Sequence, residues 1–315
     1  MKKILLLSAV GFVLCRSAAA MELWDQHVRA TDVGQYAGML PPQGVYFVDN
    51  NIFVSFNKYD SGGNEVSNTE LNSYVNAPIL LWSTGLKVLG GSYAVAIAQP
   101  FDYTSASSGY SVGAGAGNLG LYNTILVPGI ISWNFKPLFV SAGLSIYLPD
   151  GTNNMTDLLS GALHNGGLPS SNSFASVEPD LGFTWLFPEG WSASASFHLA
   201  FPVGSSKVTI ANGAAAGTYN YHSGDLLMGD YTVAKEIGSW TFGVGGATQN
   251  QLSHDTQTGT SPIRANGNVE NYSVSAFAAY QFNGGLSLSG IFSHGVQTKN
   301  DVGGDMFNLR LTMSL

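Results

Sequence analysis

The last nine residues of the chain, FNLRLTMSL at positions 307–315, alternate strictly between apolar and polar side chains. Successive side chains of a β-strand point to opposite faces, so this period of two predicts a strand with one apolar and one polar face. The apolar face holds Phe307, Leu309, Leu311, Met313 and Leu315, and the polar face holds Asn308, Arg310, Thr312 and Ser314. A strand of a soluble sandwich would turn its apolar face to a core and end in a frayed tail. Here the apolar face continues to the final residue, so we expect an apolar surrounding along the whole strand.

The opposite terminus has the architecture of a secretory signal peptide. Lys2 and Lys3 precede an apolar run at 4–14, and small residues follow at 18–20. The run is short against the roughly 20 residues of a membrane-spanning helix, which disfavours an anchor. We therefore predict export with residues 1–20 as the signal peptide, and the only cysteine, Cys15, would leave with it.

The composition combines little charge with no long apolar run. Charged residues make up 10% of the chain, against about 25% in a typical soluble domain, and 39 residues are glycine. In a transmembrane β-barrel lipid-facing and lumen-facing residues alternate, which reconciles these facts. We predict an all-β fold, a transmembrane antiparallel up-and-down β-barrel in the outer membrane of a Gram-negative cell, with membrane lipid and the barrel assembly machinery as partners. The net charge of −8 disfavours nucleic acid as a partner.

The chain divides into about twelve candidate strands, an even number as such barrels require. They lie at 44–58, 70–84, 92–103, 119–133, 138–148, 173–187, 190–203, 218–236, 239–252, 268–282, 286–299 and 304–315. Short turns containing Gly or Pro are expected at 86–91, 134–137, 188–190, 237–239 and 283–285. Longer polar connections alternate with them, at 60–68, 105–118, 150–172, 204–217 and 253–267.

Residues 191–201 give the most regular strand, because Trp191, Ala193, Ala195, Phe197, Leu199 and Phe201 alternate with serines and His198. Aromatic residues gather at predicted strand ends and would form an interfacial girdle. They are Trp82, Trp133, Trp185, Phe187, Trp191, Trp240 and Phe282. The alternative is that they are core aromatics of a secreted β-sandwich.

Two short motifs match catalytic patterns without their context. GYSVG at 109–113 fits a nucleophile elbow with Ser111, and GAGNLG at 115–120 fits a dinucleotide-binding loop, but neither has the strand and helix that the chemistry needs. The six histidines lack metal-ligand spacing. A barrel lipase using His198 is a further alternative, but its serine neighbours share its own strand. We expect no enzymatic activity, no metal and no cofactor.

Four segments in order resemble the outer-membrane proteins of the phenol meta-pathway degradation family. They are LPPQGVYF at 40–47, PDG at 149–151, YHSGD at 221–225, and WTFGVGGATQN at 240–250 followed by Gln251 and Asp255. Gln43, Asp150 and Leu315 depart from the family pattern. The resemblance implies an outer-membrane channel for passive uptake of small hydrophobic or aromatic compounds.

A barrel of about twelve strands is wide enough for a narrow lumen. We predict as charged lining Glu178, Asp180, Asp230, Arg310 and Lys235. The candidate solute path holds Glu178, Asp180, His198, Asp225, Asp230, Gln249, Gln251, Asn308 and Arg310. Mixed charge signs favour neither an anion filter nor a cation filter.

Residues 21–43 form a separate segment before the barrel, which we place at 44–315. Residues 22–39 carry few β signals, so they either plug the lumen from the periplasmic side or hang below it, with Leu40–Pro42 as a stiff link. Two other classes stay open. One is a structural or surface-interaction barrel without transport, and the other is an autotransporter translocator, which the short segment before residue 44 disfavours.

Overall fold

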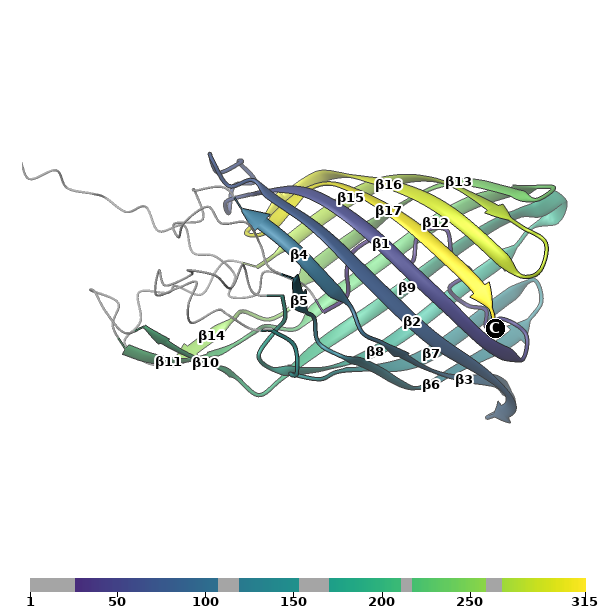
Figure 1. Cartoon of the computed structure of the whole chain (residues 1–315), viewed down its shortest axis with the longest axis horizontal. Helices are drawn as coiled ribbons and strands as arrows, with labels where there is room; N and C mark the ends of the chain where they lie inside the picture. The colour runs from purple at the N-terminus through teal and green to yellow at the C-terminus, as the bar shows by residue number, and fades with distance from the viewer. Residues whose placement is uncertain (1–25, 107–118, 153–169, 211–216, 259–267) are drawn as a thin grey trace, which may run out of the picture.

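The computed structural model describes residues 26–106, 119–152, 170–210, 217–258 and 268–315. The predicted signal peptide, GYSVG at 109–113 and most of GAGNLG at 115–120 lie outside these residues. Twelve antiparallel wall strands close into a barrel, which confirms the predicted fold (Figure 1). No helix among the described residues is long and apolar enough to cross a membrane.

The wall strands follow each other around the barrel in sequence order. They are β1 (Gly44–Lys58), β2 (Leu71–Val88), β3 (Gly91–Ala98) continued by β4 (Phe101–Ala106), β5 (Leu119–Leu121) continued by β6 (Ile125–Phe135), β7 (Leu138–Tyr147), β8 (Ala175–Leu186), β9 (Trp191–Val203), β12 (Leu226–Ile237), β13 (Trp240–Gln251), β15 (Glu270–Gln281), β16 (Leu286–Lys299) and β17 (Val302–Ser314). β1 pairs with β2 on one side and with β17 on the other, from Tyr46 opposite Ser314 to Lys58 opposite Val302. The closing strand predicted from the alternation therefore completes the wall.

The predicted strand at 218–236 was wrong as a single element. β11 (Gly217–His222) belongs to a small sheet with β10 (Ser206–Ile210) and β14 (Thr256–Thr258), and only β12 joins the barrel. The break has a local cause, because the amides of Gly224 and Asp225 bond to Asp255 and Ser253 rather than to a neighbouring strand. In Figure 1 this small sheet extends from the end of the barrel opposite the C-terminus.

The first short turn is tighter than predicted. β2 runs to Val88 and β3 starts at Gly91, so only Leu89 and Gly90 lie between them. Both have positive φ, 49° and 81°, as a two-residue hairpin turn that matches the twist of its strands requires. The other short turns lie at the same end, which we call the turn end, and the longer connections lie at the loop end.

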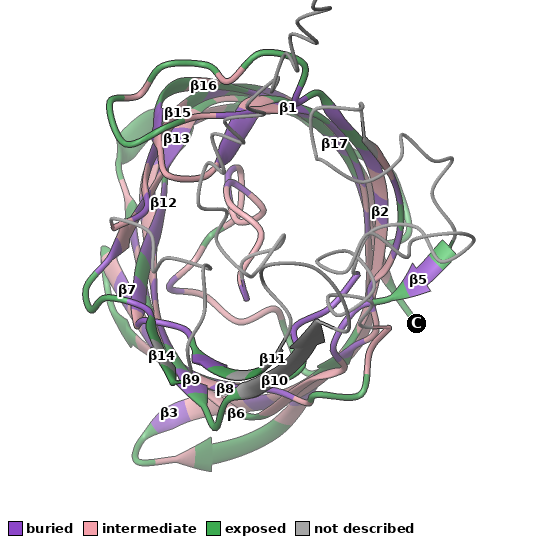
Figure 2. Ribbon diagram, turned by 90° about the vertical axis from the view of Figure 1, so that its left-hand side faces the viewer, coloured by how far each residue is buried: buried purple, intermediate pink, exposed green. Residues whose placement is uncertain are grey.

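Burial alternates along the wall strands with the predicted faces. In β17 Phe307 and Leu309 are exposed while Asn308 and Arg310 are buried. In β9 Trp191 and Phe201 are exposed, and Ser192, Ser194, Ser196 and His198 are buried. The wall is therefore apolar outside, as lipid requires, and its inner face carries polar residues together with an apolar group that includes Ile52, Val54, Phe56, Ile291 and Met306. Figure 2, seen along the barrel, shows the closed ring of strands.

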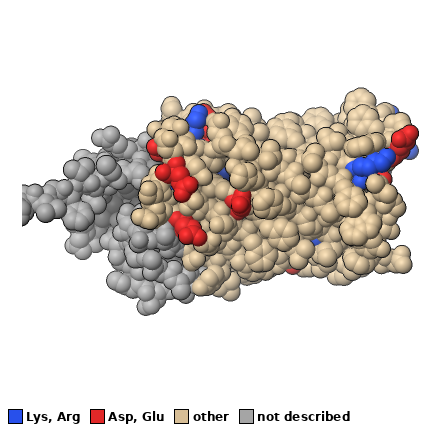
Figure 3. Space-filling model, turned by 90° about the horizontal axis from the view of Figure 1, so that it is seen from above, with Lys and Arg blue, Asp and Glu red and all other residues tan. Residues whose placement is uncertain are grey.

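Exposed aromatic residues surround the turn end of the barrel. They include Trp82, Trp185, Phe187, Trp191, Trp240 and Phe282. Trp185 stacks on Phe187 with ring centroids 5.9 Å apart, and Trp240 stacks on Phe242 at 5.6 Å. Figure 3 shows charged atoms toward the two ends of one face and an uncharged band between them. This distribution fits a lipid belt with an interfacial girdle at its edge.

The predicted place of Lys235 in the lumen was wrong. Lys235 shares the outer face of β12 with Tyr231 and Val233, and its amine lies 5.3 Å from the ring centroid of Trp191. A lysine at the edge of a lipid belt reaches along the surface toward water while its charge contacts an aromatic face. Side chains alternate between the two faces of β12, so Asp230 faces the lumen and Lys235 does not.

Candidate functional site

Residues 26–43, which we call the N-terminal segment, lie inside the barrel (Figures 1 and 2). The segment is a series of turns, with backbone bonds from Val33 to Ala30 and from Met39 to Tyr36. The carbonyl of Gln26 accepts a hydrogen bond from Tyr122, between β5 and β6. Because the N-terminal segment contains no strand, its remaining backbone amides and carbonyls need hydrogen-bond partners from the wall.

Side chains of β12 hold the first half of the segment. Asp230 accepts hydrogen bonds from the amides of Ala30 at 2.9 Å and Asp32 at 2.8 Å, and Thr232 accepts one from Gly34 at 3.0 Å. Thus two successive lumen-facing residues of β12 accept hydrogen bonds from every second amide of the segment. Side chains of the wall thus provide the hydrogen-bond acceptors that the backbone of a neighbouring strand would otherwise provide.

Arg310 holds the segment from the opposite side of the lumen. Its guanidinium donates hydrogen bonds to the carbonyls of Thr31 and Val33, and to Asn50 Oδ1 at 3.1 Å. Asn308 donates to the same Asn50 oxygen at 3.0 Å. The segment is therefore held between a carboxylate on β12 and a guanidinium on β17, and bonds to charged groups are the stronger kind.

The second half of the segment lies against β6, β7 and β8. The amide of Gly38 donates to Thr184 at 2.9 Å, Ser132 donates to the carbonyl of Gly38 at 2.8 Å, and Ser141 donates to the carbonyl of Ala37 at 2.8 Å. A Cβ placed on Gly182 would lie 2.1 Å from that same Ala37 oxygen. The missing side chain at Gly182 is what permits this close approach.

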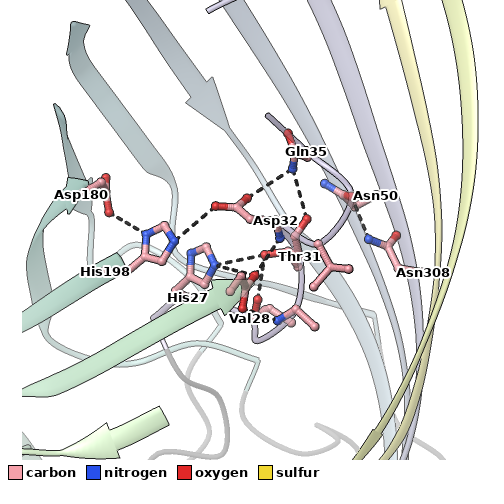
Figure 4. Close-up of polar contacts among 12 residues, drawn as sticks. His27, Val28, Thr31, Asp32, Gln35, Asn50, Asp180, His198 and Asn308 are labelled. Carbon is pink, nitrogen blue, oxygen red and sulfur yellow. Dashed lines mark hydrogen bonds and ion pairs between the residues drawn. The ribbon is translucent and has the colours of Figure 1, made fainter. Parts of the chain in front are cut away.

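His27 of the segment stacks on His198 of β9, with ring centroids 3.7 Å apart and an interplanar angle of 16° (Figure 4). His198 Nδ1 lies 2.7 Å from Asp180 Oδ1, and its Nε2 lies 3.2 Å from Asp32 Oδ2. Glu178 Oε1 accepts a hydrogen bond from Tyr147 and lies 3.6 Å from His198 Nδ1. The stacked pair thus joins the segment to the wall.

The charges around this pair, which we call the histidine cluster, are unbalanced. Its carboxylates are Asp32, Glu178, Asp180 and Asp230. Arg310 is the one guanidinium bonded to the segment beside them among the described residues. With both imidazoles neutral the group has three more negative than positive charges. Uncompensated charge in a lumen with little water is costly, so the cluster favours protonated imidazole.

Two sets of side chains have the composition of a metal site, His27 with Glu178 and His198, and His27 with Asp32 and Asp230. The lone pairs of an imidazole lie in the plane of its ring, and these two rings are nearly parallel at 3.7 Å. One ion cannot lie in both planes. Both nitrogens of His198 also face carboxylates, so this arrangement does not match tetrahedral coordination by the two rings.

The structure brings five of the nine predicted path residues together around the N-terminal segment. They are Glu178, Asp180, His198, Asp230 and Arg310, and Asn308 adjoins them through Asn50. Gln249 is buried in the wall and accepts a hydrogen bond from Asn271 at 3.0 Å. Gln251 donates to Asp255, and Asp225 donates its amide to Ser253, so these two lie away from the cluster at the loop end.

The sequence interpretation missed His27 and Asp32, the two ionisable groups that the segment contributes to the cluster. Neither residue lies in a stretch with the apolar and polar alternation of a strand. The one available signal was the occurrence of a histidine and an aspartate in a segment that precedes a barrel with a charged lining.

A small pocket of about 30 Å³ lies between the segment and the wall. Its lining includes Arg29, Ala30, Phe56, Ser293 and Met306. The guanidinium of Arg29 lies 5.4 Å from the ring centroid of Phe56, and it donates to the carbonyl of Val302 at 3.0 Å. The pocket joins apolar surface to a few polar groups, and with the segment in place it has room for about one water molecule.

A family model described as "Putative MetA-pathway of phenol degradation" matches residues 55–311. The COG4313 outer membrane channel from Pseudomonas putida F1 is similar in structure, with a TM-score of 0.71 and 14% identity over 90% of this chain and 99% of that chain. The TodX monoaromatic hydrocarbon channel deltaS2 mutant gives a TM-score of 0.46 and 10% identity over 86% and 90%. No curated protein matches the chain. The first of these structures has the same fold.

Proposed function

We propose that this chain, which belongs to the family of the MetA-pathway of phenol degradation, is a passive conduit for small hydrophobic or aromatic compounds. The conduit lies in the outer membrane, where the barrel assembly machinery inserts it. The proposal assigns the protein no catalytic role.

The observation that carries the proposal is a closed wall whose lumen is filled by a separable segment. Residues 26–43 precede β1 and contact the wall through hydrogen bonds and packing, so they can leave without breaking a strand pair. A purely structural barrel has no need of a lumen filling that the wall itself does not provide. The segment makes the conduit gated rather than open.

The lining supports a weakly polar or aromatic solute. Phe56 and Met306 supply apolar surface beside the segment, and Arg29 supplies a cation near an aromatic face, so a solute would meet this surface when the segment moves. An aromatic ring with a hydroxyl group can use both kinds of contact. Of the wall carboxylates in the histidine cluster, Asp230 is hydrogen-bonded to the segment, while Glu178 and Asp180 are bonded to Tyr147, Ser145 and His198 of the wall.

The test is deletion of residues 22–39 with the signal peptide kept. We expect a rise in single-channel conductance of the refolded protein and faster uptake of phenol by proteoliposomes, because the lumen loses its filling. The folded fraction is checked by heat-modifiable mobility in electrophoresis. A truncated barrel that inserts normally yet stays closed to ions and to phenol would contradict the conduit and favour a structural barrel acting through its loops.

A further inference from the structure

Both ring nitrogens of His198 lie close to carboxylates. Nδ1 is hydrogen-bonded to Asp180 Oδ1 on β8 at 2.7 Å, and Nε2 lies 3.2 Å from Asp32 Oδ2 on the N-terminal segment, within ion-pair distance but without a hydrogen bond. A neutral imidazole has one protonated nitrogen and one lone pair. In either neutral tautomer the lone pair would lie beside a carboxylate oxygen. The geometry therefore favours the doubly protonated ring, an imidazolium of the wall that faces the segment.

The neighbouring ring has its own proton fixed by a hydroxyl group. Thr31 Oγ1 donates to the carbonyl of Val28 at 2.7 Å, so its contact with His27 Nε2 at 3.2 Å needs the proton on the nitrogen. His27 Nδ1 then faces Glu178 Oε1 at 3.8 Å. Glu178 Oε2 is buried and has no hydrogen-bond partner among the described residues. His27 thus adds an Nε2 donor to the cluster.

We propose that a proton on His198 locks the N-terminal segment into the lumen, so that opening of the barrel depends on pH. This lock rests on the proposed function only in using the same segment as the gate. Asp180, on the neighbouring wall strand, orients the His198 ring through Nδ1, and Nε2 faces Asp32 of the segment. The positive charge of the ring therefore attracts the segment to the wall, the two parts that must separate.

The direction of the pH dependence follows from the charged and titratable groups around the His198 ring. They are Glu178 and Asp180 on β8, Asp230 on β12, Asp32 and His27 on the segment, Arg310 on β17 and the hydroxyl of Tyr147 on β7. Loss of the proton turns one His198 contact from attraction to repulsion and leaves the carboxylates in excess. Rising pH therefore favours release.

The experiment measures potassium chloride conductance of the full-length protein in planar bilayers from pH 5 to pH 9. For one linked proton the ratio of open to closed channels rises about tenfold per pH unit across the transition. We expect the wild type to be closed in the mildly acidic range and to open as pH rises. His198→Gln, which keeps hydrogen-bonding capacity but carries no charge and does not titrate, should stay open throughout and lose the pH dependence.

The matched control is His294→Gln. His294 also pairs with an aspartate, Asp305 at 2.6 Å, but it lies on the outer face with 60% of its side chain exposed. It should keep the wild-type profile. Asp32→Asn is the second variant, because it removes the segment's half of the lock without altering the wall. It should be open in the same range as His198→Gln even if the latter fails to insert.

A wild-type conductance that does not change from pH 5 to pH 9 would overturn the lock, and so would an Asp32→Asn or His198→Gln channel with the wild-type profile. Failure of the lock is distinguishable from failure of the conduit. If ion conductance follows pH as expected but the 22–39 deletion carries no phenol, the lock stands and the solute assignment fails. If the deletion variant carries phenol while conductance does not depend on pH, the solute assignment stands and the lock fails.

Discussion

Gly182 in the middle of β8 allows the most direct test of the contacts by which the wall holds the N-terminal segment. Strand dihedrals suit any L-residue, so Gly182→Ala adds one methyl group without straining the backbone. That methyl carbon would lie 2.1 Å from the Ala37 carbonyl oxygen and 2.4 Å from Ser141 Oγ. An ordinary contact needs the oxygen to retreat by about 1 Å. The wall strand is fixed by two neighbours, so the segment has to move.

The retreat acts on three hydrogen bonds at once. They are Ser141 to Ala37 at 2.8 Å, Gly38 to Thr184 at 2.9 Å and Ser132 to Gly38 at 2.8 Å. At about 0.5–1.5 kcal/mol each, their loss disfavours the seated segment by about 2–4 kcal/mol. The ratio of open to closed barrels should then rise by about 30-fold to 1,000-fold.

The assay is the open fraction in single-channel recordings, at the pH where the wild type is closed. Gly143→Ala is the matched control, because it adds the same methyl group to the lumen face of β7, where the nearest atoms lie at 3.6 Å. It should behave as wild type. If Gly182→Ala inserts as well as the control and opens no more often, the segment is not held against β8 in the way described.

Three other substitutions test the faces and contacts of the wall. Val244→Arg, on the exposed face of β13 four residues beyond Trp240, should cost about 2–4 kcal/mol in urea unfolding in vesicles if it lies near the membrane midplane. Leu311→Arg should cost less in the same assay, because Asp49 lies directly opposite on the outer face of β1, and equal costs would argue against that pairing. Thr232→Val removes the acceptor for Gly34 and should raise the open fraction by about threefold to tenfold without lowering the free energy of unfolding of the wall; an unchanged open fraction would contradict the contact.

The wall could be predicted from the sequence because alternation is a local signal. The range 44–58 coincides with β1, and 286–299 coincides with β16. The interruption between β3 and β4 at Gln99 and Pro100 was not predicted, since the residues on both sides continue the same apolar character. Proline cannot donate to the ladder, which is the physical reason for a break there.

The contents of the lumen were harder to predict. The lining residues Glu178, Asp180, Asp230 and Arg310 follow from strand parity, but parity does not say what they bind. Asp230 and Arg310 bond to backbone groups of residues 30–33, and Arg310 and Thr31 are separated by 279 positions. Backbone amides and carbonyls are the same in every sequence, so such contacts carry no residue signal.

The guanidinium that holds the segment lies on the strand that closes the wall, and this sets the order in which the parts can form. Before β17 pairs with β1, Arg310 is not beside Asn50, and the carbonyls of Thr31 and Val33 have no cation to accept from. An open sheet of eleven strands therefore holds residues 26–43 through β6, β7, β8 and β12, but without the guanidinium. Contacts of such large sequence separation slow folding. Closing the barrel thus also completes the attachment of the segment, because residues near the start of the chain are held by a residue near its end.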